Sequence, residues 1–427
     1  MDKILQEAYL AILNEELIPA MGCTEPIAVA YGAAIARATL GEIPDSLEIR
    51  VSGNIVKNVK SVIVPHTGGL KGIAAAAAAG IIAGQADKEL EVISHVTPEQ
   101  ISLIGEYLSK ASFSVLESDS GCVFDIEITV RKANSYAAVR LSGYHTNIVK
   151  IEKDGKVLHF SEYTDGEHEK RTDRKLLTVE KIIEFADKVE LALVRDIIGR
   201  QIAYNTAIAE EGLQGKWGAN IGRILLSSYG SSVQNRAKAM AAAGSDARMN
   251  GCEMPVVINS GSGNQGMTAS LPVIVYAGEL EAGEEELYRA LIVSNLVTIH
   301  LKTGIGRLSA YCGAVSAGCG AGAGVTYLYG GRYRDISHTI VNALAINSGV
   351  ICDGAKSSCA AKIASAVEAG LLGMEMYRQG SQFLSGEGIV TKGVENTIKN
   401  VGELAREGMK ETDHKIIRLM IDTVEVH

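Results

Sequence analysis

Residues 311–331 read YCGAVSAGCGAGAGVTYLYGG, and residues 347–362 read NSGVICDGAKSSCAAK. These two segments contain four of the seven cysteines of the chain: Cys312, Cys319, Cys352 and Cys359. The members of each pair are seven residues apart, which is two turns if the segment is helical. The surrounding residues are almost uncharged and rich in Gly, Ala and Ser. We therefore expect backbones to approach closely here and to leave room for a group that is not a side chain.

The composition limits the class of protein. A chain of 427 residues predicts about two domains. Only 5% of the residues are aromatic while 46 are glycine, which indicates helices that pack closely through small side chains. The net charge of −9, without a cluster of Lys or Arg, argues against binding to nucleic acid or to an anionic membrane surface.

The N-terminal residues, the apolar runs and the number of cysteines indicate in which cellular compartment the protein is expected. The first residues, MDKILQEAYLAILNEE, carry acids where a signal peptide has its apolar core. The long uncharged runs at 254–278 and 308–331 are too rich in Gly and polar residues to be good membrane spans. An odd number of cysteines without an export signal favours reduced thiols. We expect a cytoplasmic protein that has no membrane partner.

A change in composition near residue 45 predicts the domain organisation. Six segments alternate like strands, and two others, at 72–84 and 97–110, read as helices. The strand candidates are SLEIRVSG, KSVIVP, VFDIEITVRK, SYAAVRLSG, NIVKIEK and KVLHFSE. The sequence therefore predicts a mixed fold: a mainly α-helical catalytic domain (1–44 plus 171–427) with an inserted α+β domain (45–170). The charged run at 165–175 is the expected linker back to the helices.

The rest of the chain is predicted to be helical. Residues 4–17 form an amphipathic pattern, and the pattern resumes at Val179. The tail, with VENTIKNVGELAREGMK and HKIIRLMIDTV, predicts two ordinary amphipathic helices in which the sequence indicates no chemistry.

The segment MGCTEP carries the signals of a helix start. Thr24 is the expected N-cap, followed by Glu25 and Pro26, and the helix is expected to stop at Gly41. Cys23 then lies just before a helix N-terminus, where the dipole and free N–H groups favour a thiolate. The alternative is a small buried cysteine in a turn.

A second loop, Ser260 to Gly266, is dense in backbone N–H groups and side-chain amides. It has the sequence SGSGNQG and precedes an apolar run that is expected to be helical. Such a loop suits a carboxylate or a phosphate. It lacks the features of a P-loop and of a dinucleotide site, and a tight structural turn is the alternative. Its candidate binding residues are Ser260, Ser262, Asn264 and Gln265.

The spacing of Cys312, Cys352 and Cys359 suggests metal ligation. No C-x-x-C pair is present, so zinc-ribbon and thioredoxin interpretations are poor. Three thiolates on a [4Fe–4S] cluster leave one iron open, which can bind a substrate atom as a Lewis acid. The alternative is that these are small hydrophobic core residues. We assign Cys122 and Cys252 to packing.

Two further segments offer polar groups. His66 follows an expected strand in VPHTGGLKG, although a lone histidine is more often structural. Asn54, Lys57 and Asn58 can meet a carboxylate or a leaving thiolate, and an exposed hairpin is the alternative.

Several motifs together resemble the iron–sulfur L-cysteine desulfidases, relatives of the α-domain of iron–sulfur L-serine dehydratases. They are PAMGCTEP, SGNIVKN, ARMNG, PVVINSGSGNQG, GRLSAYCGA and ICDGAKSSCAAK, in this order along the chain. The resemblance implies that Cys312, Cys352 and Cys359 bind a [4Fe–4S] cluster. It also implies that Cys23 is a further active-site cysteine, either a base or a ligand. Cys319 lies outside the motifs and stays unassigned.

The resemblance implies β-elimination of L-cysteine to pyruvate, ammonia and hydrogen sulfide, with an amino acid as the small-molecule partner. SGSGNQG has no cysteine where the serine dehydratases carry a cluster ligand, which favours the desulfidase branch. The alternatives are an L-serine dehydratase, a pyridoxal-phosphate β-lyase, and a non-catalytic iron–sulfur or amino-acid-binding protein. The Gly/Ala-rich helices would permit a homo-oligomer.

Overall fold

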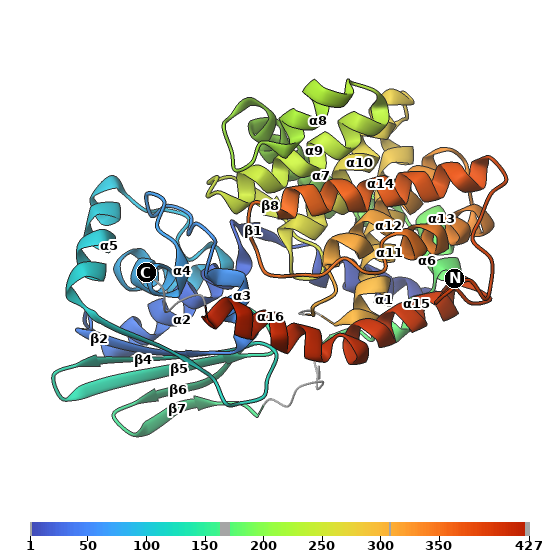
Figure 1. Cartoon of the computed structure of the whole chain (residues 1–427). Helices are drawn as coiled ribbons and strands as arrows, with labels where there is room; N and C mark the ends of the chain where they lie inside the picture. Colours follow the sequence, from blue (N-terminus) through green and yellow to red (C-terminus); the bar gives the residue numbers. More distant parts are fainter. Residues whose placement is uncertain (1, 163–170, 307–308, 423–427) are drawn as a thin grey trace.

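The computed structural model describes residues 2–162, 171–306 and 309–422. It is mainly helical, with a mixed six-stranded sheet at one side of the described chain (Figure 1). The predicted mixture of helices and strands is therefore confirmed, while the division into a catalytic and an inserted domain stays a prediction.

Most of the helices form one bundle, which has its own hydrophobic core. Its members are α1 (Lys3–Glu16), α6 (Val179–Lys188), α7 (Arg195–Gln214), α8 (Ile221–Tyr229), α9 (Val233–Met249), α10 (Gly263–Glu279), α11 (Glu284–Ile305), α12 (Gly313–Leu328), α13 (Tyr333–Ile346), α14 (Cys359–Arg378) and α15 (Val394–Glu403). A two-stranded antiparallel ribbon of β1 (Pro19–Met21) and β8 (Pro255–Val257) lies beside them. A π-helical turn, η4 (Leu404–Gly408), joins α15 to the last helix, α16 (Lys410–Asp422).

The sheet has the order β3-β2-β4-β5-β6-β7. Its strands are β2 (Ser46–Val51), β3 (Ser112–Glu117), β4 (Asp125–Lys132), β5 (Ser135–Ser142), β6 (Ile148–Lys153) and β7 (Lys156–Phe160). The β2–β3 pair is parallel and the other pairs are antiparallel. The helices that accompany it are α2 (Thr24–Leu40), α3 (Gly53–Val59), α4 (Gly72–Ala83) and α5 (Pro98–Lys110).

A second hydrophobic core joins this sheet to α2 and α4. Residues of α2 from Ile27 onward belong to this core, because α2 packs against α4 and against β4 and β5. The predicted domain boundary at residue 45 assigns this helix to the helical part, whereas in the structure it packs with the sheet. Alanines along α2 and α4 let the two helices approach each other over the sheet.

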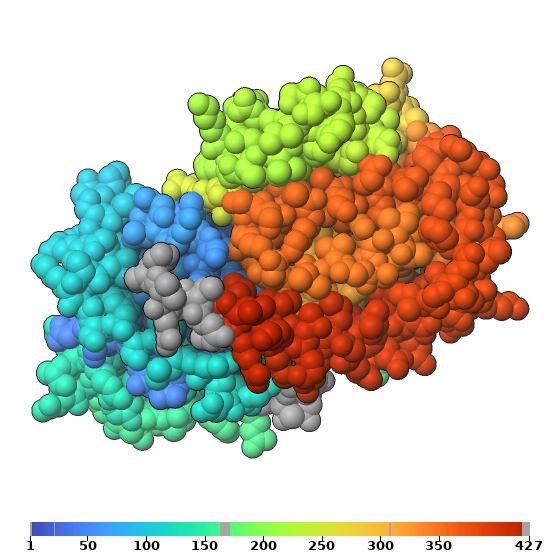
Figure 2. Space-filling model, in the orientation of Figure 1, coloured from blue at the N-terminus to red at the C-terminus, as the bar shows by residue number. Residues whose placement is uncertain are grey.

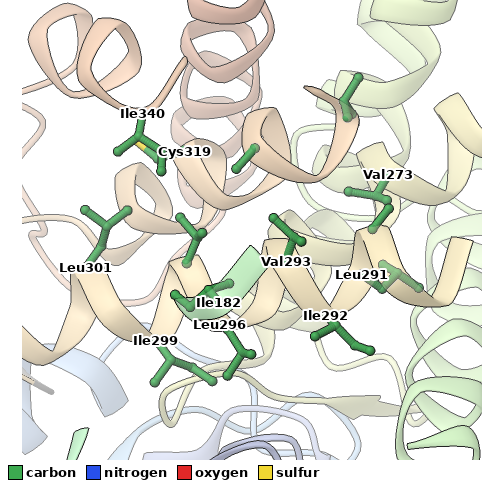
Figure 3. Packing of buried hydrophobic residues seen from close by; sticks show 14 of the residues in the cluster. Ile182, Val273, Leu291, Ile292, Val293, Leu296, Ile299, Leu301, Cys319 and Ile340 are labelled. Carbon is green, nitrogen blue, oxygen red and sulfur yellow. The ribbon is translucent and has the colours of Figure 1, made fainter. Parts of the chain in front are cut away.

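Glycines set the distance between helices at the centre of the bundle. A Cβ at Gly318 in α12 would lie 2.2 Å from the carbonyl oxygen of Ala366 in α14. One at Gly370 would lie 2.1 Å from the carbonyl oxygen of Gly318. The close approach of backbones that the sequence predicts is therefore present. Cys319 is 1% exposed and belongs to the same core cluster as Ile340, with which it is labelled in Figure 3, so packing accounts for it.

The local predictions had mixed outcomes. The helix start at Thr97 is confirmed by a capping box with Gln100, and the end of α2 at Gly41 is confirmed by its left-handed φ of 94°. The N-cap of α2 is Cys23, so the prediction of Thr24 is wrong by one residue.

The structure differs from the sequence predictions at residues 60–65 and at β3. The prediction of a strand at KSVIVP is wrong, since within this segment only Ile63 forms an isolated bridge, to Lys71. The parallel strand β3 had no alternating pattern that sequence reasoning recognised, and its residues are largely exposed. The predicted linker at 165–175 lies partly outside the described residues.

The C-terminal helix α16 lies between the two parts of the molecule. In Figure 1 it passes from the helical bundle to α3, and Figure 2 shows its surface against both. The Lys57 ammonium on α3 pairs with the Asp413 carboxylate on α16 at 2.5 Å, and Lys60 donates to the Met420 carbonyl. The tail is therefore part of the structural junction.

Candidate active site

A cavity of about 740 Å³ lies at this junction. Both parts of the molecule contribute to its lining: the starts of α2, α3, α10, α12 and α14, the 117–124 segment, and α16. Among the lining residues are four cysteines that the sequence singled out, Cys23, Cys312, Cys352 and Cys359.

Two of the predicted cluster ligands stand at helix N-termini. Cys312 is the N-cap of α12, and Cys359 is the first residue of α14. The third, Cys352, lies in the loop before α14. An antiparallel bridge fixes this loop, with the Cys312 N–H donating to the Val350 carbonyl at 3.0 Å and the Cys352 N–H to the Ala310 carbonyl at 2.6 Å. Cys352 therefore lies outside the helix, so it is not two helical turns from Cys359, although both residues line the cavity.

Burial disfavours the thiolate forms of Cys312 and Cys359 in the absence of a cation. Burial, with a smaller contribution from the nearby Cys352, raises the pKa of Cys312 to about 12. Burial also raises the pKa of Cys359, with a smaller contribution from Cys352. The three sulfurs thus lie within electrostatic range of one another. Within the described ranges, no group of three or more Cys, His, Asp or Glu is arranged to hold a single metal ion.

Cys23 is the N-cap of α2 and is almost fully buried, with its Sγ 3.9 Å from the Met249 Sδ. Burial raises its pKa to about 12, while the Arg248 guanidinium lowers it. Burial therefore opposes the thiolate that the helix N-terminus was expected to favour at Cys23. Its catalytic role stays a prediction.

The SGSGNQG loop leads directly into α10, which begins at Gly263 with Ser262 as N-cap. Ser260, at a φ of 51°, donates its hydroxyl to Asn259 at 2.8 Å. The side-chain Oδ1 of Asn264 accepts a hydrogen bond from Arg248 at 3.2 Å, whereas the buried Oε1 of Gln265 has no hydrogen-bond partner in the described structure. All four predicted residues of this loop line the cavity.

The predicted residues of α3 also line it, and the hairpin alternative is wrong because the segment is a helix. Asn54 has a buried Oδ1 that no described residue satisfies. The ammonium of Lys57 is already neutralised by Asp413. Gly354, at a φ of 90°, lies so close to α3 that a Cβ would be 2.1 Å from the Lys57 carbonyl oxygen. This contact brings the loop of Cys352 against α3, beside Asn58.

His66 is not among the residues that line this cavity. Its Nδ1 lies 3.2 Å from Glu253 Oε1, and burial lowers its pKa. Its φ of 57° places it in a turn after Val64. Its buried Nε2 has no hydrogen-bond partner among the described residues. The predicted role of His66 in substrate binding stays a prediction, and it takes no part in the proposals below.

Sequence reasoning missed several lining residues. Glu25 and Arg248 stand inside the motifs PAMGCTEP and ARMNG, so the motifs were the available signal. Lys302 is a lone lysine on an apolar helix face. The tail was predicted to be without chemistry, yet Asp413 lines the cavity, and so does Cys122, which was assigned to packing.

Comparison with known proteins shows to which family the chain belongs. Residues 87–418 match the family model described as the serine dehydratase alpha chain. The chain belongs to the serine dehydratase alpha chain family. This match includes Cys312, Cys352 and Cys359 but begins after Cys23 and α3. The predicted relation to the alpha domain of the iron–sulfur serine dehydratases is thereby confirmed, and the family is that of a lyase-type enzyme.

Relatives extend the similarity over nearly the whole chain. A UPF0597 protein of Desulfitobacterium hafniense is 61% identical over 416 residues, which cover 97% of both chains. UPF0597 proteins of Lachnoclostridium phytofermentans and Treponema denticola are 52% and 47% identical, over 98% and 99% of this chain and 100% and 99% of their own lengths. These names state no activity. Within the described residues of this family member, no helix has the length and apolarity to cross a membrane.

Proposed function

We propose that the protein is an L-cysteine desulfidase that depends on a [4Fe–4S] cluster. It converts L-cysteine and water to pyruvate, ammonia and hydrogen sulfide. The observation that carries the proposal is that Cys312, Cys352, Cys359 and Cys23, from four separate segments, line one cavity.

The donor set fits a cluster. Thiolates are the ligands that iron–sulfur clusters use, and two of these thiols stand at helix N-termini that stabilise negative charge. Each ligand of a cubane binds a different iron, so its thiolates need not converge on one point. Burial makes a lone thiolate unfavourable. A bound cation offsets this cost, because a coordinated thiol is deprotonated. Cys312, Cys352 and Cys359 would hold the cluster.

The cluster, when bound, would supply an open Lewis-acidic iron that makes the substrate sulfur a better leaving group. The residues of the chain have the remaining tasks. The N-terminus of α10, with Asn264 and Gln265, would orient the substrate. A base removes the Cα proton; the Cα–H electron pair forms the new double bond, and sulfur leaves with the Cβ–S electrons. The resulting 2-aminoacrylate tautomerises to an imine that hydrolyses in water.

We propose Cys23 as this base, a role worth ~10²- to 10⁴-fold in rate. It needs positive charge nearby to form a thiolate, and Arg248 supplies part of it. Glu25 is the competing candidate: it lines the same cavity, and burial raises the pKa of its carboxyl, which brings it closer to the pH of the reaction. If Cys23 is a ligand instead, its loss removes iron as well as activity.

L-serine is the alternative substrate, and the family description favours it. The absence of cysteine from SGSGNQG supports the desulfidase, because the serine dehydratases that the sequence resembles carry a cluster ligand in that loop. Sulfur is also the softer ligand for iron.

The test is anaerobic purification followed by iron and acid-labile sulfide analysis. Pyruvate formation is then measured with L-cysteine and with L-serine at equal concentration, and sulfide release with L-cysteine. The proposal expects a higher kcat/KM for L-cysteine. Faster turnover of L-serine would assign the dehydratase, and a cluster-bearing protein that is inert with both would contradict an enzymatic role.

A further inference from the structure

Lys302 is a buried charged residue that the mechanism above does not use. It lies near the end of α11, its side chain is 4% exposed, and it lines the cavity. Across the described ranges, no carboxylate, carbonyl or hydroxyl accepts a hydrogen bond from its ammonium. Burial lowers the pKa of Lys302 to about 8, and the nearby Cys352 and Cys312 oppose this shift. Lys302 is thus within electrostatic range of two of the proposed cluster ligands.

Three other cations of the cavity lining already have partners. Lys57 pairs with Asp413, and Arg248 donates to the Gly22 carbonyl at 3.0 Å and to Asn264. Lys362 pairs with Asp353. Lys302 differs from all three, because no described carboxylate or carbonyl oxygen pairs with its ammonium, which has the thiols of Cys352 and Cys312 nearby. An unpaired ammonium is costly to bury, so its natural partner is an anion that enters the cavity.

Two side-chain amide oxygens also line the cavity. The buried Oδ1 of Asn54 and Oε1 of Gln265 line it without partners among the described residues. One cation and two amide oxygens match the two ends of an α-amino acid, a carboxylate and an ammonium. We propose that Lys302 binds the α-carboxylate of the substrate and makes the cavity selective for α-amino acids over their uncharged derivatives. This inference rests on the proposed function, whose substrate it describes in more detail.

A structural role for Lys302 makes a different prediction. If its ammonium only compensates the charge of the ligand thiolates, replacing it will lower the iron content and leave carboxylate recognition unchanged in the protein that retains iron. The two roles are therefore distinguished by binding measurements on iron-loaded protein.

The experiment compares wild-type holoprotein with Lys302→Met, which keeps the length of the side chain, and Lys302→Arg, which keeps the charge. Lys238→Met is the matched control, because Lys238 is a largely buried lysine on α9 that pairs with Glu368 outside the cavity lining. The probes are L-alanine, which has no leaving group, and L-alaninamide, which lacks the carboxylate charge. Their binding is measured by anaerobic calorimetry, beside KM and kcat with L-cysteine.

We expect wild-type protein and Lys238→Met to prefer L-alanine. Lys302→Met should lose this preference while its iron content stays unchanged. Its KM for L-cysteine should rise roughly 10- to 100-fold, which corresponds to the loss of one hydrogen bond to a charged group. Lys302→Arg should recover part of it. An unchanged preference in Lys302→Met, or loss of its iron, would overturn the inference. Wild-type protein that binds L-alanine but releases no sulfide from L-cysteine would overturn the proposed function alone.

Discussion

The middles and the N-termini of α12 and α14 differ in what they enclose. At their middles the backbones touch, with Gly318 and Gly370 leaving no room for a side chain. At their N-termini the same helices carry Cys312 and Cys359 to the wall of a cavity. The glycine-rich segments therefore have two functions. Small residues fix how the helices cross, and this crossing fixes where the thiols stand.

The difference also separates two kinds of cysteine in one helix. Cys319, two turns into α12, is surrounded by core side chains, whereas Cys312 at the start of α12 faces other thiols. Position along the helix, and not residue type, decides which of them can act as a ligand. The predictions below either remove a ligand end or disturb the packed middle.

The largest effect is expected for Cys352→Ala. It removes one proposed ligand, and we expect iron and sulfide release to be lost together. The loss of several kcal/mol of Lewis-acid stabilisation corresponds to more than about 10³-fold in activity. The measurement is iron content and kcat/KM after anaerobic reconstitution. Cys122→Ala is the control, since it removes a thiol from the same cavity that is not a proposed ligand; iron loss in that variant alone would reverse the assignment.

The next effect concerns the base. Cys23→Ala should keep its iron and lose ~10²- to 10⁴-fold in kcat. Glu25→Gln is the comparison variant, which keeps the shape of the side chain. Exchange of the Cα proton of L-cysteine in deuterated water reports the proton transfer directly. If exchange stops only in Glu25→Gln, then Glu25 is the base and our assignment is wrong.

The third prediction uses the depressed pKa of Lys302. An unfolded lysine titrates near ~10.4, while burial lowers the pKa of Lys302 to about 8. Between these values the unfolded chain binds more protons, so the stability of the folded state rises with pH. At pH 7 we expect metal-free Lys302→Met to be more stable than wild type by about 3 kcal/mol. Urea unfolding should show this gap shrinking toward pH 10, and a gap independent of pH would contradict it.

The smallest effect is expected at the packed middle. The Cβ of Gly318→Ala would meet the Ala366 carbonyl at 2.2 Å, and a backbone atom cannot rotate away. We expect a loss of roughly 1–3 kcal/mol in the free energy of unfolding. Gly278→Ala in α10 is the control, because no atom lies within 4 Å of its Cβ position. Equal stability of the two variants would show that this crossing is not tight.

The sequence was sufficient for much of the fold. Capping residues such as Thr97 and the left-handed Gly41 act locally, so their signals predicted helix limits correctly. The packing of α2 with the sheet depends on contacts with residues a hundred positions away, such as Leu141, and no local pattern encodes them.

For the site, motifs predicted which segments contribute, and the structure brings most of the predicted residues to one cavity. Asp413 was missed because its role is to pair with Lys57, 356 residues away. Lys302 was missed because a single lysine on a helix has no motif; only its burial sets it apart. For Cys23, the sequence shows a helix N-terminus but not the degree of desolvation, which opposes the expected thiolate.

The most direct test of the central claim is a Mössbauer spectrum of the ⁵⁷Fe-loaded, anaerobic protein with and without L-cysteine. Three thiol ligands on a four-iron cluster predict that one iron signal shifts when L-cysteine is added while the other three remain. Four signals that do not respond to L-cysteine, or a protein that assembles no cluster, would contradict the account.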